Sequence, residues 1–169
     1  MLTRGCLLLV ACWLASQGAF AADKGSTPPH VDIYGPKVCL ACIDWADHLR
    51  DNGFSATFHG TEDMAAVKRR LKVPPDVESV LTATVAGYFI EGHVPADDIK
   101  QLLKEKPKAR GLAVPGQPRG APGFEKSAPF CERGCTILDT VNTEEVVRRE
   151  LYDTLLVAPN GKTSIWARH

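Results

Sequence analysis

The chain has 169 residues, of which 44% are hydrophobic and 24% charged, which is enough apolar material for one folded domain. Its 20 basic and 20 acidic residues balance to a formal net charge of zero, so nucleic-acid binding is not indicated. The densest basic cluster, Lys68-Arg69-Arg70, is explained as the solvated face of a helix.

The first 21 residues have the pattern of a signal peptide. Arg4 is followed by an apolar run from Leu7 to Leu14 and by the small-x-small site Ala19-Phe20-Ala21. We expect cleavage after Ala21 and export to the periplasm, with no transmembrane segment, since a span needs roughly 20 apolar residues. The alternative is a lipoprotein anchored at Cys12, because Leu9-Val10-Ala11-Cys12 resembles a lipobox.

After a polar leader at 22–30, alternating and helical patterns predict a core over residues 31–105. A strand, a cysteine pair and a helix come first, then a strand, a helix, a strand pair and a helix. This order is typical of a thioredoxin-like fold. The predicted elements are strands at 31–34, 54–59, 82–88 and 89–94, and helices at 42–52, from an N-cap at Thr61 to Pro74, and from Pro95 through Leu103.

The rest of the chain predicts an extension of that core. Residues 106–135 form a proline- and glycine-rich loop with no expected regular element, and they carry a second cysteine pair. Residues 136–169 predict a helix at 143–151 and a hairpin turning at Asn160-Gly161, packed on the core. The predicted class is therefore α/β, thioredoxin-like, with a C-terminal proline-rich extension and a β-hairpin.

Cys39 and Cys42 are the residues that most strongly indicate chemistry. They stand between a strand and a helix, where unpaired N–H groups and the helix dipole favour a thiolate. A thiolate binds soft metals and attacks disulfides. The pair therefore predicts a metal site or, if the protein is an oxidoreductase, an attacking Cys39 and a resolving Cys42; a small structural disulfide is the simpler alternative.

Cys131 and Cys135 form the second pair. Disulfides persist in exported proteins, and the four cysteines after the signal peptide allow three pairings. A structural disulfide that holds the proline-rich loop is favoured for Cys131 and Cys135. Metal ligation, or relay of a disulfide to Cys39 and Cys42, are the alternatives.

Several stretches resemble the CopG-like bacterial copper-resistance proteins, long catalogued as a domain of unknown function. The likeness runs from about Val31 to Val114 and resumes from Tyr152 to His169. Its anchors are Cys39 to Arg50, Asp63-Met64-Ala65-Ala66-Val67-Lys68, Val73-Pro74-Pro75, Gly87 to Ile99 and Gly111-Leu112-Ala113-Val114-Pro115-Gly116. The resemblance implies an exported thioredoxin-like domain that handles copper or copper-linked thiol redox chemistry. It also implies periplasmic copper-export or thiol-redox proteins as partners.

The sequence departs from this family where ligands are expected. The family carries Cys-x-Cys-Cys at the first site, but Ala41 replaces the middle cysteine here. It carries Ser-Cys-His-Thr before the third strand, where this chain has Ser79-Val80-Leu81-Thr82. Only Cys39 and Cys42 carry over from the sulfur cluster. Cys131 and Cys135 are candidate replacement ligands, and His93, in the matched Gly-His-Val-Pro segment, is either a ligand or structural.

Three hypotheses follow. The first is a periplasmic copper-handling protein that binds Cu(I) through Cys39 and Cys42, with Cys131, Cys135 and His93 as further candidates. The second is a thiol–disulfide or copper oxidoreductase that uses Cys39 and Cys42. The third is a scaffold or binding module that has lost its metal site. Fold alone does not separate them.

Overall fold

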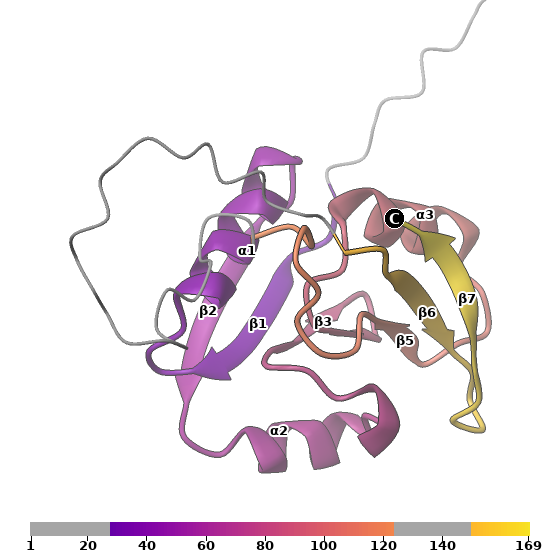
Figure 1. Cartoon of the computed structure of the whole chain (residues 1–169), viewed down its shortest axis with the longest axis horizontal. Helices are drawn as coiled ribbons and strands as arrows, with labels where there is room; N and C mark the ends of the chain where they lie inside the picture. The colour runs from indigo at the N-terminus through magenta and orange to yellow at the C-terminus, as the bar shows by residue number, and fades with distance from the viewer. Residues whose placement is uncertain (1–27, 124–149) are drawn as a thin grey trace, which may run out of the picture.

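The computed structural model describes residues 28–123 and 150–169 (Figure 1). The predicted signal peptide, Cys131 and Cys135 lie outside this part of the chain, as does nearly all of the helix predicted at 143–151. Only Glu150 and Leu151 of that helix are described, and neither is helical.

One mixed sheet of seven strands, in the order β2-β1-β3-β4-β5-β6-β7, forms the frame of the described chain. Strand β1 is parallel to β2 and antiparallel to β3, β3 and β4 form a hairpin, and β5 is parallel to β4. Strands β6 and β7 extend the sheet as an antiparallel hairpin. The strands are β1 Val31–Pro36, β2 Ala56–Thr61, β3 Thr82–Val85, β4 Tyr88–Glu91, β5 Gly111–Ala113, β6 Asp153–Val157 and β7 Thr163–Arg168.

Helices cover both faces of the sheet. Helices α1 (Leu40–Asp51) and α3 (Ala96–Glu105) pack with one set of alternating strand residues, among them Ile90 and Leu112. The neighbouring residues Phe89 and Ala113 point to the other face, as strand geometry requires. That second face is covered by α2 (Met64–Leu71) and the short 3-10 helix η1 (Pro75–Val77), which lie at the lower edge of Figure 1.

The sequence predicted α1 well and α2 less well. Helix α1 begins two residues earlier than expected, and Gly53 follows it with a φ of 88°, as predicted for its C-terminus. The N-cap of α2 is Asp63, not Thr61, because the Asp63 carboxylate accepts a hydrogen bond from Ala66 N–H at 2.8 Å. Thr61 instead ends β2, which starts at Ala56 and not at Phe54.

Strand β5 contradicts the prediction that residues 106–135 hold no regular element. It has only three residues, which is too short for an alternating pattern to be detected among prolines and glycines. Gly111 makes the pairing possible, because a Cβ at this position would lie 1.9 Å from the Phe89 carbonyl oxygen. The proline-rich composition therefore conceals the strand that joins the core to the C-terminal hairpin.

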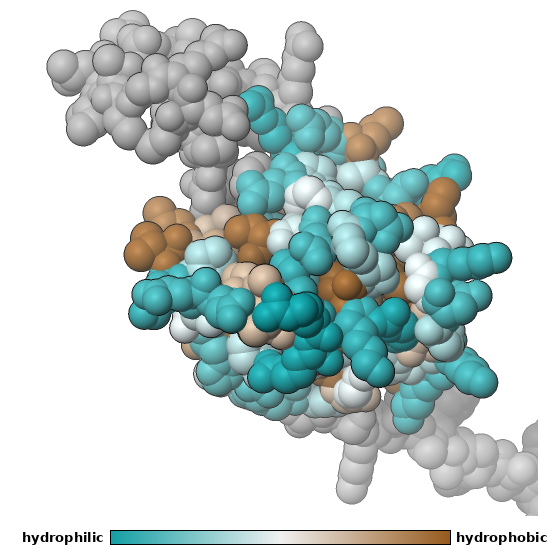
Figure 2. All heavy atoms as spheres, turned by 90° about the horizontal axis from the view of Figure 1, so that it is seen from below, coloured by the Kyte–Doolittle hydropathy of each residue, from teal (hydrophilic) through white to brown (hydrophobic). Residues whose placement is uncertain are grey.

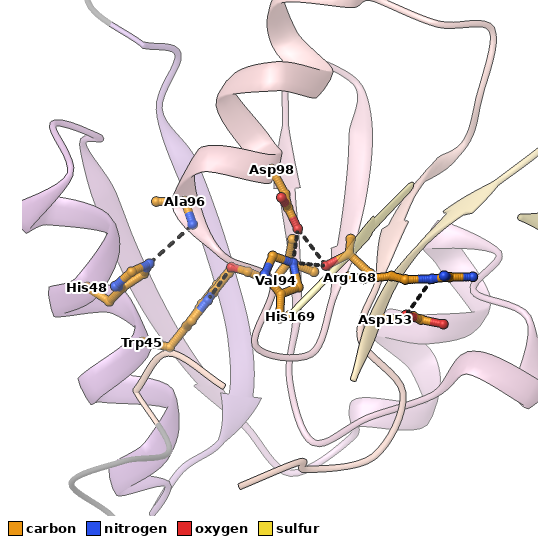
Figure 3. Close-up of polar contacts among 9 residues, drawn as sticks. Trp45, His48, Val94, Ala96, Asp98, Asp153, Arg168 and His169 are labelled. Carbon is orange, nitrogen blue, oxygen red and sulfur yellow. Dashed lines mark hydrogen bonds and ion pairs between the residues drawn. The ribbon is translucent and has the colours of Figure 1, made fainter. Parts of the chain in front are cut away.

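The C-terminal hairpin was predicted and is present as β6 and β7. The Asp98 carboxylate on α3 accepts a hydrogen bond from Thr154 at 2.6 Å and lies 2.9 Å from Nε2 of the terminal His169 (Figure 3). Asp153 and Arg168 form an exposed ion pair at 3.8 Å across the two strands. The contacts of Asp98 attach the C-terminal hairpin to α3.

None of the helices within residues 28–123 and 150–169 is both long and apolar enough to span a bilayer.

Candidate metal and thiol site

The first cysteine pair lies where the chain passes from β1 to α1. Cys39 is the N-cap of α1 and has an extended backbone, so its side chain folds over the first turn of the helix. The backbone N–H of Cys42 donates a hydrogen bond to Cys39 Sγ at 3.2 Å. The two residues form a disulfide with their Cα atoms 5.3 Å apart. The predicted convergence of both sulfurs at the mouth of the helix is confirmed.

The two sulfurs differ in their surroundings. Cys39 is 9% exposed, whereas Cys42 is fully buried. On the side of the sheet, Gly35 lies so close that a Cβ there would be 2.9 Å from Cys42 Sγ. Glycine at this position therefore lets the helix approach β1, and both cysteines belong to the buried core, Cys42 more completely than Cys39.

His93, a predicted candidate ligand, lies beside this pair but is fully buried. Burial lowers the pKa of its imidazole to about 4, against the effect of a backbone hydrogen bond to Ala41, which raises it. The ring is therefore neutral at neutral pH. Its contact is with the backbone between the two cysteines, which favours a role in holding the Cys39–Cys42 turn.

The segment from Gly92 to Ala96 is attached along one face of α1. Besides the contact of His93 with Ala41, the Trp45 indole donates to the Val94 carbonyl at 2.9 Å, and Ala96 N–H donates to His48 Nε2 at 3.1 Å (Figure 3). Ala41, Trp45 and His48 are spaced at i, i+4 and i+7, one side of a helix. His48, expected to be solvent-exposed, is half-buried and caps the start of α3.

The positions where the family resemblance implies further ligands lie next to the pair and are apolar. Thr82 is opposite Tyr34 in the β1–β3 register, which places Leu81 at the level of Gly35. Leu81 is fully buried in the same core cluster as Cys39 and Cys42, and Val80 packs against that cluster. The sulfur pair is thus flanked by hydrocarbon and not by further ligands from this segment.

The sequence analysis assigned Lys68 to a solvated helix face, and this prediction is wrong. Lys68 is buried, with 7% of its surface exposed. Its ammonium pairs with the fully buried carboxylate of Glu91, which also accepts hydrogen bonds from Thr82 Oγ1 and Ser79 N–H, both at 2.6 Å. Burial raises the pKa of Glu91, and the hydrogen bonds and charge of Lys68 oppose that rise. Sequence offered one signal: Lys68 shares the inward stripe of α2 with Met64 and Leu71.

Within the described chain, no group of three or more histidine, cysteine, aspartate or glutamate side chains is arranged to hold a metal ion. Cys39 and Cys42 bring together two sulfur atoms. The predicted roles of Cys131 and Cys135 lie outside the described residues and stay predictions.

Comparison with known proteins places these features in a family. A model for a protein family of unknown function, DUF411, matches residues 77–124. No curated protein matches. Two solved structures, "Copper resistance protein copG" Forms 1 and 2, are each 35% identical, with a TM-score of 0.68, over 84% of this chain and 98% of theirs. The chain therefore belongs to the CopG family of copper resistance proteins.

Proposed function

We propose that the protein is an exported copper-handling protein that binds Cu(I) through the thiolates of reduced Cys39 and Cys42. The observation that carries this proposal is the convergence of both sulfurs at the N-terminus of α1. Thiolates are the preferred ligands of Cu(I), and the Cys42 N–H that donates to Cys39 Sγ favours the ionised form of that side chain. The family's copper resistance supports the choice of metal.

The copper-binding form must be the reduced one. In the disulfide each sulfur is bonded to the other, and neither has a thiolate charge to offer a metal. Two-electron reduction leaves both sulfurs on the same turn, with Cys42 fully buried and Cys39 9% exposed.

The surroundings of the pair favour a small site. Leu81 and Val80 supply no donor where the family resemblance implies two ligands, and Ala41 supplies none between the cysteines. Two thiolates suit one Cu(I) ion in two-coordinate geometry. We therefore propose one ion per chain at this site and no multi-copper centre of the family's usual kind.

The proposal includes a thioredoxin-like core and export. The strand order β2-β1-β3-β4, with β1 parallel to β2 and antiparallel to β3, supports this fold, as does the position of the cysteine pair after β1. The signal peptide at 1–21 predicts that the periplasmic form starts at Ala22. Intact mass measurement of the protein recovered from the periplasm distinguishes this form from a lipid-modified Cys12.

The test is an anaerobic titration of Cu(I) into the reduced protein in competition with a chromophoric chelator. We expect one ion per chain to be withdrawn from the chelator, and the Cys39→Ser/Cys42→Ser variant to lose at least about a thousandfold in affinity. Cys131→Ser/Cys135→Ser is the matched control, with two cysteines removed elsewhere. Equal affinity in the Cys39→Ser/Cys42→Ser variant would overturn the proposal, and absence of competition in all three proteins would leave the oxidoreductase or scaffold hypothesis.

A further inference from the structure

A pocket of about 750 Å³ lies at the end of the sheet opposite the cysteine pair. Pro28 and Pro29, just before β1, form part of its wall, whereas Cys39 follows the other end of that strand. The turn between β3 and β4 and the C-terminal half of α3 supply the rest of the wall. The pocket is therefore separate from the proposed copper site.

The lining of this pocket combines apolar and basic side chains. Leu103 and Tyr88 are half-buried and pack against the main hydrophobic core, and both also line the pocket. Lys100, Lys104 and Lys106 line it as well, and none of the described residues in its wall is acidic. A mostly apolar pocket with a few charged groups is the usual form of a binding site for a small organic ligand.

The positive charge beside the pocket is only partly neutralised by nearby carboxylates. Residues 100–110 hold five basic side chains and a single acidic one, Glu105. Lys100 pairs with Asp97 at 3.0 Å, but Lys104 and Lys106 form no ion pair with another described residue. Because the uncompensated lysines stand in the wall of the pocket, their charge favours an anionic ligand there.

Two contacts give the pocket its shape without a ligand. The Tyr88 hydroxyl donates a hydrogen bond to the Pro107 carbonyl at 3.0 Å, which fixes the ring relative to the end of α3. Lys106 is the left-handed C-cap of α3, and its N–H donates to the Leu102 carbonyl at 2.8 Å. A pocket that is already formed loses less conformational entropy when a ligand binds.

We propose that this pocket binds a small organic anion with an apolar body, of the kind represented by a medium-chain carboxylic acid. Leu103 and Tyr88 contact the apolar body, and Lys104 and Lys106 attract the anionic group. The inference goes beyond the proposed copper function and does not depend on it, because no sulfur atom takes part.

The first test is a titration of the isotope-labelled protein, with its disulfide intact, with octanoate, followed by NMR. We expect the backbone N–H signals of Gly87, Tyr88 and residues 103–106 to shift until they saturate. Octanol has the same chain without the charge, and acetate has the charge without the chain. Each should bind at least about fivefold more weakly than octanoate. Shifts confined to other residues, or octanol binding as tight as octanoate binding, would overturn the inference.

The second test removes the charge and has a matched control on another helix. Lys106 is the C-cap of α3 and Lys104 lies in its last turn, while Lys72 and Arg69 have the corresponding places on α2. Arg69→Gln/Lys72→Gln therefore removes the same charge from the same kind of helix end as Lys104→Gln/Lys106→Gln. Figure 2 views the molecule from the side of α2, and the described surface there is mostly hydrophilic.

The two variants should differ in their affinity for octanoate. We expect Lys104→Gln/Lys106→Gln to bind it about fivefold more weakly than the unsubstituted protein, because two charges that favour the carboxylate are lost. Arg69→Gln/Lys72→Gln should keep the original affinity. Equal affinities in the two variants would show that the lysines of the pocket have no specific role and would overturn the inference.

Discussion

Two neighbouring regions of the molecule lie where the family resemblance implies metal ligands, and their side chains differ in kind. At the mouth of α1, Cys39 and Cys42 remain as a sulfur pair, with exposed Val38 and Leu40 on either side of Cys39. At the entry to β3, Val80 and Leu81 contribute hydrocarbon to the core. The first region keeps two sulfur atoms, while the second contributes only hydrocarbon to the same core.

The entry to β3 is also held by hydrogen bonds on the opposite face of the sheet. Thr82 and Ser79 both donate hydrogen bonds to buried Glu91, whose charge is paired with Lys68 on α2. A buried ion pair contributes little net stability by itself, but removing one partner is costly. Buried polar contacts therefore connect α2, β3 and β4, whereas the sulfur pair lies on the first turn of α1.

The largest effect should come from breaking these buried polar contacts at Lys68. Lys68→Met leaves the Glu91 carboxylate buried without its cation, and we expect a loss of about 3–5 kcal/mol in the free energy of unfolding. Arg69→Met, the exposed neighbour on the same helix, is the matched control and should cost no more than about 0.5 kcal/mol. Because burial raises the pKa of Glu91, acidification should neutralise it and shrink the loss. Equal losses in the two variants, measured by urea denaturation, would place Lys68 on a solvated face.

His93 contacts the backbone of Ala41, between the two cysteines, and its lowered pKa predicts that the stability of the protein depends on pH. Its pKa is lowered from 6.5 to about 4 in the folded protein, so the unfolded chain binds more protons between these values. Stability contributed by neutral His93 is therefore present above pH 6.5 and lost as the pH falls toward 4, by about 3 kcal/mol in total.

Urea denaturation at several pH values checks this prediction when it is carried out on His93→Gln in parallel. Carboxylates, including Glu91, titrate in the same range in both proteins. The difference in the free energy of unfolding between the unsubstituted protein and His93→Gln therefore reports the imidazole alone. We expect the difference to narrow as the pH falls from 6.5 to 4. A constant difference would contradict the buried, neutral state of His93.

The smallest effect concerns Ala41, where the family resemblance implies a third cysteine. Ala41 is half-buried between the cysteines, so Ala41→Cys adds a third sulfur on the same turn. We expect the reduced variant to bind Cu(I) about tenfold more tightly, or to bind a second ion, in competition with a chelator. Ala41→Ser, which adds an oxygen of similar size, should leave the affinity unchanged. No gain from Ala41→Cys would mean that this side chain cannot reach the copper ion.

Local patterns predicted much of the described structure. The spacing of Cys39 and Cys42 placed both sulfurs on one helical turn, and the strand and helix periods predicted the order of elements through α3. The Asn160-Gly161 signal predicted the C-terminal hairpin. These features depend on interactions between residues close in sequence, or on a single apolar face of one element. They can therefore be predicted from the sequence alone.

What was missed depends on partners distant in sequence. Lys68 was assigned to a solvated face because its partner, Glu91, stands 23 positions away on another strand. His48 was expected in solvent because its hydrogen-bond donor, the backbone N–H of Ala96, is 48 positions away in the sequence. The inequality of the two sulfurs likewise follows from the close approach of Gly35 to Cys42, which only the packing of α1 on β1 reveals.

The most direct test of copper binding by this thiolate pair is X-ray absorption spectroscopy of the Cu(I)-loaded Cys131→Ser/Cys135→Ser variant. We predict a first shell of two sulfur atoms, which the further substitutions Cys39→Ser and Cys42→Ser abolish together with the bound copper. A first shell of nitrogen or oxygen atoms alone, or copper retained after both substitutions, would contradict the account.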